Sequence, residues 1–318
     1  MLVSVVIPCL NEADVIGQLH DSVTQQVGPL DSDLELIFVD DGSTDTTLEI
    51  LRCLAGKDPR VRYVSLSRNF GKESAMLAGL RLARGDAVVL MDADLQHPPE
   101  LLVHMVEHYR AGAHQVVAQR DRAGDPWFRR AASRTFYRVV NALVDVKLVD
   151  GAGDFRLLSR RACDALLELS EYNRFSKGLF SWIGFSPVYL PYANVARTTG
   201  RTKWTLRGLV RYAADGIMSF NDRPLRLAVY IGFPITLFAF GYMLWVIVQA
   251  IIHGVSTPGY VTVVTAVIAF GGLQMLLLGI MGEYLGRVYY ETKRRPHYLV
   301  GETDEDVPKA PPPDFGRP

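Results

Sequence analysis

Residues 87–99, AVVLMDADLQHPP, place two carboxylates directly after a short apolar run. The run from Ala87 to Met91 is rich in Val and Leu and predicts a buried strand. Asp92 and Asp94 follow at alternate positions, so both carboxylates can turn toward one crevice, and Gln96 lies one alternate position further on. Oxygen ligands of this kind suit Mg²⁺ or Mn²⁺ held together with a pyrophosphate. The alternative is a loop in which Asp caps the helix that the two prolines begin.

The same succession of strand and helix recurs along the first 120 residues. Further apolar runs predict strands at Val3–Ile7, Leu34–Val39, Val61–Leu66 and Gln115–Ala118. Between them, apolar side chains return at helical spacing, namely Ile16, Leu19, Val23 and Val27, then Leu48, Leu51 and Ala55. Alternating strands and helices predict an α/β domain with a mostly parallel sheet. Ligands of such sheets bind beyond the carboxyl ends of the strands.

The residues after the first two predicted strands are also polar, PCLNE at 8–12 and DDGSTD at 40–45. Asp40 and Asp41 would repel the carboxylates at 92–94 unless cations or hydrogen-bond donors lie between them. Carboxylates concentrated at strand ends therefore imply a ligand. Asp45 has a simpler explanation as a capping residue of the helix that continues through Leu54.

These motifs, with DADLQHPPE at 92–100, resemble in their order the donor-site motifs of inverting glycosyltransferase family 2. Three later segments are similar to the polyisoprenyl-phosphate glycosyltransferases of that family, GDFRLLSRR at 153–161, RFSKGLFSWIGF at 174–185 and GRTKW at 200–204. The bacterial undecaprenyl-phosphate glucosyltransferases are the most similar group. The resemblance implies a Rossmann-like GT-A domain that transfers a hexose, with inversion, to the phosphate of a polyisoprenyl phosphate. Glucose from UDP-glucose is the first expectation, and mannose from GDP-mannose or N-acetylglucosamine from its UDP donor are the alternatives.

The same resemblance implies roles for individual residues. It implies donor contacts by Pro8, Leu10, Asn11, Glu12, Val39, Asp40, Asp41, Lys72, Asp92 and Ala93. It implies metal contacts by Asp92, Asp94 and Gln96, and acceptor-phosphate contacts by Arg130, Ser133, Arg134, Arg156 and Lys203. Asp94 and Asp154 would be catalytic. The family usually has Tyr before Asn-Glu, where this chain has Cys9-Leu10, so stacking on the base is in doubt there.

Two of these roles have simpler alternatives. Asp154 could orient or deprotonate the attacking group, or it could pair with Arg156 to hold a loop. Arg130, Arg134 and Arg138 repeat every fourth residue on a predicted helix, and guanidinium groups match phosphate oxygens. A solvated basic face, or attraction to anionic lipid headgroups, explains the same spacing.

Two long stretches, Leu227–Ile252 and Tyr260–Gly282, contain no Asp, Glu, Lys or Arg. Each exceeds the roughly 20 residues that a helix needs to cross hydrocarbon, although a buried core helix is the alternative. The link at 253–259 is short and turn-rich, so we expect a transmembrane hairpin. Basic residues flank both outer ends, Arg223 and Arg226 before it and Arg287 and Lys293–Arg295 after it, which places both ends in the cytoplasm.

The predicted layout has four parts: a glycosyltransferase domain at 1–203, an interfacial amphipathic helical segment at 204–224, the hairpin at 225–286, and a basic, then disordered tail at 287–318. Packing of residues 204–220 against the sheet is the alternative to an interfacial helix. We expect a multi-pass protein of the inner membrane with a cytoplasmic catalytic domain. The expected partners are a nucleotide sugar, a polyisoprenyl phosphate, membrane lipid and a second copy of the chain. Zero net charge suggests no nucleic acid, and three widely spaced cysteines suggest a reducing compartment.

Three other functions are alternatives for this sequence. His104–His108 fits H-x-x-E-H, a zinc peptidase motif, but the sequence offers no third ligand nearby. A non-catalytic domain that senses sugar nucleotides would bind a donor without consuming it. A processive polysaccharide synthase normally has Q-x-x-R-W and more spans, and this sequence has neither.

Overall fold

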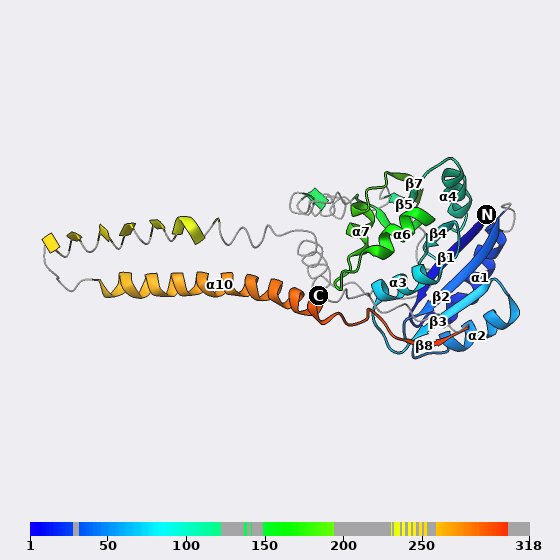
Figure 1. The fold of residues 1–318 in the computed structure, drawn as a ribbon, viewed down its shortest axis with the longest axis horizontal. Helices are drawn as coiled ribbons and strands as arrows, with labels where there is room; N and C mark the ends of the chain where they lie inside the picture. The colour runs from blue at the N-terminus through cyan, green and yellow to red at the C-terminus, as the bar shows by residue number, and fades with distance from the viewer. Residues whose placement is uncertain are drawn as a thin grey trace, which may run out of the picture.

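The computed structural model describes residues 1–27, 32–121, 149–193 and 259–304, together with single residues within 137–141 and 230–252. Most of these residues form one α/β part, and a long helix, α10, leads away from it (Figure 1). The α/β part carries every described residue of the predicted catalytic site.

An eight-stranded mixed sheet forms the centre, in the order β7-β5-β6-β4-β1-β2-β3-β8. The strands are β1 (Leu2–Cys9), β2 (Asp33–Asp40), β3 (Val61–Leu66), β4 (Ala87–Leu90), β5 (Gln115–Asp121), β6 (Ala152–Ser159), β7 (Pro187–Ala193) and β8 (Val300–Thr303). Strands β4, β1, β2 and β3 are parallel neighbours, whereas β6 runs antiparallel to both β4 and β5. The α/β prediction is confirmed, and the sheet is more mixed than the sequence indicated.

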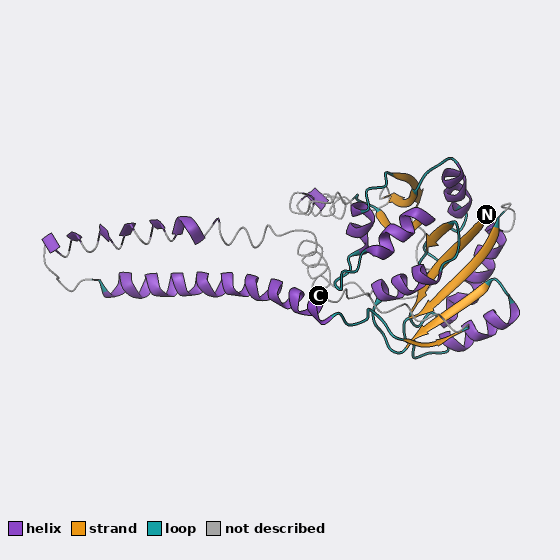
Figure 2. Cartoon of the chain, in the orientation of Figure 1, coloured by secondary structure: helices purple, strands orange, loops and turns teal. Residues whose placement is uncertain are grey.

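Helices cover both faces of the sheet (Figure 2). The described helices are α1 (Ala13–Val27), α2 (Thr47–Lys57), α3 (Lys72–Leu82), α4 (Leu101–Arg110), α6 (Arg160–Glu168), α7 (Ser176–Trp182) and α10 (Tyr260–Lys293). Apolar residues of α1, α2 and α4 pack on one face, and those of α3, α6 and α7 pack on the other. Ile16 and Leu19, predicted from helical spacing, are fully buried. Because Val and Ile dominate the central strands on both faces, the sheet is a core layer between two helical layers.

Strand β6 is one of three strands, with β7 and β8, that the sequence patterns did not reveal. It inserts between β4 and β5, with Arg156 opposite Leu90 at the end of β4. Asp154 precedes Arg156 by two residues and therefore lies just beyond the end of β4, near the D-x-D segment. The antiparallel strand thus brings residues from the middle of the chain to the carboxyl edge of the parallel strands.

The predicted disorder of the tail is wrong for residues 300–304. Val300–Thr303 form β8, which pairs antiparallel with β3 at the edge of the sheet. Glu302 makes two hydrogen bonds to Arg52, at 2.7 and 2.5 Å, and accepts a third from Tyr63 Oη at 2.7 Å. A polar composition favours disorder only when no partner is present, and the open edge of β3 supplies one. Residues 305–318 lie outside the described part.

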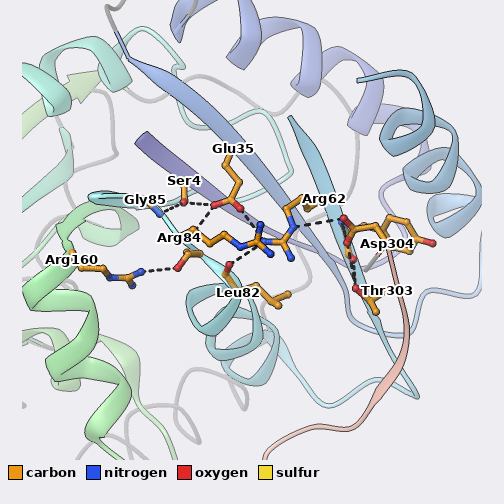
Figure 3. A network of polar contacts seen from close by, with 11 residues as sticks. Ser4, Glu35, Arg62, Leu82, Arg84, Gly85, Arg160, Thr303 and Asp304 are labelled. Carbon is orange, nitrogen blue, oxygen red and sulfur yellow. Dashed lines mark hydrogen bonds and ion pairs between the residues drawn. The ribbon is translucent and has the colours of Figure 1, made fainter. Parts of the chain in front are cut away.

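A buried polar network ties this C-terminal strand to the first strands of the sheet (Figure 3). Glu35 accepts hydrogen bonds from Ser4 Oγ at 2.5 Å, Arg62 Nη1 at 3.0 Å and the backbone N–H of Arg84 at 3.1 Å. The other side of the Arg62 guanidinium faces Asp304 Oδ2, at 3.6 Å from its Nε. Paired in this way, the charges of Glu35 and Arg62 are tolerated inside the sheet.

The described residues do not support the predicted transmembrane hairpin. Within them, no helix combines the length and the apolar character that crossing a membrane requires, so the prediction of two transmembrane spans is not supported. Helix α10 begins at Tyr260, where the second apolar stretch begins, and continues beyond Gly282 to Lys293. Only single residues of the first predicted span are described, and the segment 204–224 lies outside the described part.

Candidate active site

The loops after β1 and β2 lock together through polar side chains. Asn11 adopts a positive φ of 56°, a conformation that Asn tolerates. Its Oδ1 accepts the backbone N–H of Thr44 at 2.8 Å, and its own N–H donates to Ser43 Oγ at 2.9 Å. Gly42 has a φ of 70°, and a Cβ there would lie 2.4 Å from the carbonyl carbon of Arg68. The predicted donor loops therefore form one fixed surface.

Asp40 and Asp41 are buried, and hydrogen-bond donors surround them. Asp40 accepts from Ser65 Oγ at 2.6 Å and from a backbone N–H in the DDGSTD loop. Asp41 accepts from the backbone N–H groups of Phe70 at 2.7 Å and Gly71 at 2.9 Å. Burial raises the pKa of Asp41, although these two N–H groups oppose the shift. Donors therefore offset the repulsion that the sequence predicts among the strand-end carboxylates.

The remaining predicted donor residues lie in the same region. Pro8 and Val39 are paired across β1 and β2, and the backbone N–H of Glu12 donates to Thr47 Oγ1. Leu10 is half-buried, and Ala93 is buried. Asp45 Oδ1 accepts the N–H of Thr47, the first residue of α2, which confirms that Asp45 caps this helix although Thr46 holds the cap position.

The D-x-D segment turns sharply after β4. Leu95 has a φ of 57°, a strained conformation for a branched side chain, and the backbone N–H of Gln96 donates to Asp94 Oδ1 at 3.2 Å. Among the described residues, no group of three or more His, Cys, Asp or Glu side chains gathers as a metal site. Two carboxylates and the Gln96 amide oxygen nevertheless fit a magnesium or manganese ion, which binds few protein ligands beside phosphate and water. They do not fit a tetrahedral zinc site.

Lys72 brings the two halves of the predicted site together. Its ammonium lies 2.6 Å from Asp92 Oδ1 and 2.7 Å from Asp154 Oδ2, at the first residue of α3. Burial opposes the charged form of Lys72, but the two carboxylates outweigh it and raise the pKa of this lysine. Burial likewise acts to raise the pKa of Asp154, and the ammonium groups of Lys72 and Lys177 outweigh it and hold that pKa well below its usual range. Asp154 is therefore a carboxylate at neutral pH.

The contacts of Arg156 involve Phe180 and Gly153. Its guanidinium lies 3.6 Å from the centre of the Phe180 ring and donates to the carbonyl of Gly153, so the ion pair of Asp154 is with Lys72. Arg156 and Lys177 line a cavity of about 230 Å³. The other predicted acceptor residues, Arg130, Ser133, Arg134 and Lys203, lie outside the described residues. Arg138 is described and exposed.

His97 is a site residue that the sequence analysis did not single out. Its ring is stacked on Phe155, with 4.7 Å between centroids, and its Nδ1 accepts the backbone N–H of Asp92 at 3.2 Å. Burial lowers the pKa of His97, although the nearby Asp92 and Asp94 carboxylates oppose the shift. The motif DADLQH could have indicated this role, because a His three residues after a D-x-D can hydrogen-bond to the backbone that positions the two carboxylates. His104, in contrast, is exposed beside Glu107, which does not favour a zinc peptidase.

His97→Phe should change the pH dependence of stability. The folded pKa lies below the unfolded value of about 6.5, so the unfolded chain binds the proton first and the free energy of unfolding falls as pH drops below about 6.5. Phe keeps the stacked ring and removes this titration, so the stability of the variant should depend less on pH. Denaturant unfolding of both proteins between about pH 5 and 7.5 measures the difference. If the free energy of unfolding depends on pH in the same way in both proteins, His97 does not contribute to the pH dependence of stability.

The Glycosyl transferase family 2 model matches residues 4–167, and the GtrB C-terminal hairpin model matches residues 223–288. Putative glycosyltransferase CsbB of Bacillus subtilis (strain 168) is 48% identical over 97% of this chain and 95% of its own length. The prophage bactoprenol glucosyl transferase homolog of Escherichia coli (strain K12) is 39% identical over 94% of this chain and 98% of its own length.

A crystal structure of glucosyl-3-phosphoglycerate synthase from Mycobacterium tuberculosis matches with 23% identity and a TM-score of 0.45, over 68% of this chain and 77% of that chain. This similarity is too low to support an inference about ligands. The first model and the 48% identical relative together cover the whole of the site described above, and on these grounds the chain belongs to glycosyl transferase family 2.

Proposed function

We propose that the chain transfers a hexose from a nucleotide diphosphate sugar to the phosphate of a polyprenyl phosphate, with glucose as the hexose. The observation that carries this proposal is the Lys72 ammonium between Asp92 and Asp154, beside Asp94, at the carboxyl edge of the sheet. Relatives named bactoprenol glucosyl transferase, at 37 to 39% identity, support glucose as the sugar and a polyprenyl carrier as the acceptor. UDP is the expected nucleotide.

The donor side of the site would bind the nucleotide and its diphosphate. Asp92, Asp94 and Gln96 would hold Mg²⁺ or Mn²⁺ against the diphosphate, and the ion supplies charge neutralisation as the nucleoside diphosphate leaves. Asp41 and Glu12, fixed by hydrogen bonds to the loops around them, would contact the base and ribose. This assignment places the anomeric carbon between the D-x-D segment and β6.

The acceptor side requires orientation more than proton removal. A lipid phosphate is an anion at neutral pH, so its oxygen can attack the anomeric carbon as the bond to the diphosphate breaks, and a single displacement inverts the configuration. A carboxylate with a lowered pKa is a weak base, so we assign Asp154 an orienting role. Lys72 offsets the repulsion between Asp154 and the incoming phosphate. Arg156 and Lys177 would bind that phosphate from the adjoining cavity.

Membrane association would bring the lipid to this site. Helix α10 has large apolar side chains that are 42 to 71% exposed, namely Val263, Val267, Phe270, Met275, Leu278, Met281, Leu285 and Val288. The helix ends at Lys293 and is followed by Arg294 and Arg295, which favour an anionic cytoplasmic surface. The proposed layout is therefore a cytoplasmic catalytic domain with its C-terminal hairpin against lipid of the inner membrane.

A donor screen tests the function directly. The full chain in neutral detergent is incubated with undecaprenyl phosphate, Mg²⁺ or Mn²⁺, and one radiolabelled donor from UDP-glucose, GDP-mannose and UDP-N-acetylglucosamine. We expect the UDP-glucose label to appear in extracted lipid and to disappear with a chelator. Donor that is bound but never consumed would instead identify a sensor.

A further inference from the structure

A second polar pocket lies at the end of α10 nearest the α/β part. Its volume is about 390 Å³. Three segments far apart in sequence line it: the first turn of α3 with the loop before it, the loop before α7, and the segment after α10. The residues that matter for its chemistry are Arg68, Glu73, Ser74, Tyr172, Arg174 and His297.

Two guanidinium groups dominate the charge of this pocket. Arg68 lies 4.1 Å from the centre of the Phe70 ring and donates to the carbonyl of Asn69 at 3.0 Å. Arg174 donates to the carbonyl of Leu169 at 2.5 Å. Neither has a carboxylate oxygen within 4.0 Å among the described residues. Their hydrogen bonds and ring contact are to neutral groups. Glu73 and Glu171 act on Arg174 from farther away and do not outweigh the burial that lowers its pKa, so both guanidinium groups remain able to attract an anion.

The single carboxylate in the wall does not cancel these charges. Glu73 accepts hydrogen bonds from the hydroxyl and the backbone N–H of Ser176 at the start of α7, and burial raises its pKa. Burial, then Arg174 and Arg81, lower the pKa of His297 to about 4, so its ring is neutral at physiological pH. The pocket thus disfavours further positive charge and favours a bound anion.

The position of the pocket indicates where the anion comes from. Tyr172 stacks on Tyr290 of α10 and on His297, with ring centroids 5.7 and 5.8 Å apart, and its backbone N–H donates to Glu291 at 2.7 Å. One wall is therefore tied to the last turns of the helix that carries exposed apolar side chains. If α10 lies against lipid, the pocket opens at the depth of the lipid headgroups.

We propose that this pocket, which lies beside the catalytic crevice and is lined by other side chains, binds the phosphate group of a membrane lipid. The guanidinium groups of Arg68 and Arg174 can pair with phosphate oxygens, and the Ser74 hydroxyl can donate a further hydrogen bond. The inference rests on the proposed membrane association of α10. Lipid held there anchors the catalytic domain at the membrane by a polar contact in addition to the apolar hairpin.

Calorimetric titration of the full chain in neutral detergent tests the site. The ligands are short-chain phosphatidylglycerol, farnesyl phosphate, short-chain phosphatidylcholine and inorganic phosphate. We expect saturable binding of an anionic lipid, weakened about tenfold by Arg68→Gln, the scale of one charge-assisted contact, and unchanged by Lys57→Gln on α2. Arg174→Gln should weaken the same binding. A thermal unfolding transition like that of the wild type verifies that this variant is folded. The anionic ligand whose binding Arg68→Gln weakens more identifies the source as bulk phospholipid or polyprenyl phosphate, because binding in the catalytic crevice does not depend on Arg68.

Three results would overturn the proposal: equal binding by Arg68→Gln and Lys57→Gln, equal affinity for phosphatidylcholine, or inorganic phosphate binding as tightly as either anionic lipid. Sugar transfer by the same preparations is measured separately. Sugar transfer together with lipid binding that Arg68→Gln leaves unchanged refutes the pocket and leaves the proposed function standing, whereas lipid binding that depends on Arg68 without any transfer does the reverse.

Discussion

Asp94→Asn should lower the rate of sugar transfer by about a thousandfold, or about 4 kcal/mol of transition-state stabilisation. The reason is that an amide oxygen carries no net charge, so the divalent ion that neutralises the leaving diphosphate is held less tightly. Initial rates at saturating donor, measured over a range of Mg²⁺ and Mn²⁺ concentrations, check the prediction. Excess metal should restore part of the loss.

Asp164→Asn is the matched control for this variant. Asp164 is exposed on α6, where it pairs with Arg160, so its replacement should leave transfer unchanged. If Asp94→Asn melts like the wild type and still transfers sugar at the wild-type rate, the metal assignment is wrong. An unfolded variant is recognised by its lost thermal transition.

The second large effect concerns the ion pairs of Lys72. Asp154→Asn and Lys72→Met should each reduce turnover by about a hundredfold, which is about 2.7 kcal/mol. The double variant should lose much less than the product of the two, because the ammonium and the carboxylate act as one unit. A double-mutant cycle on turnover, with donor affinity measured separately, tests this coupling.

The pH profile of Lys72→Met gives an independent readout. Without the ammonium, Asp154 loses the largest of the charges that lower its pKa, while burial still raises that pKa and Lys177 and Arg156 still lower it, so the pKa of Asp154 is higher than in the wild type. The acid limb of the rate profile should therefore move to higher pH than in the wild type. Multiplicative effects in the cycle, or weaker donor binding with unaltered turnover in Asp154→Asn, would place Asp154 outside the acceptor side.

Much of the fold follows from local patterns, but the three strands β6, β7 and β8 do not. Strands β1 to β4 are buried on both faces, so their sequences are continuous apolar runs that are easily recognised. In β6, Asp154 and Arg156 interrupt such a run because they line the site. Strand β8 has four residues, and its pairing depends on the free edge of β3, which no local pattern reveals. Polar composition therefore misled the prediction of the tail.

The candidate site divides in a similar way. Asp92 and Asp94 could be predicted because carboxylates at the ends of parallel strands lie at a common edge. Lys72 was assigned by resemblance alone, and its bridge to Asp154 depends on the direction of α3 relative to β6. The role of His97 could not be predicted, because it depends on stacking against Phe155, which is distant in sequence. Contacts between residues distant in sequence account for each feature that was missed.

The pairing of β8 with β3 constrains how the chain is synthesised. Arg52 and Glu302 are 250 residues apart, so their contact forms only after the residues between them have been translated and β8 has left the ribosome. Until then the edge of β3 is open, and an open edge can pair with another chain. A nascent chain stalled before Val300 should therefore be the most aggregation-prone stage of biogenesis, when a chaperone has the most to protect.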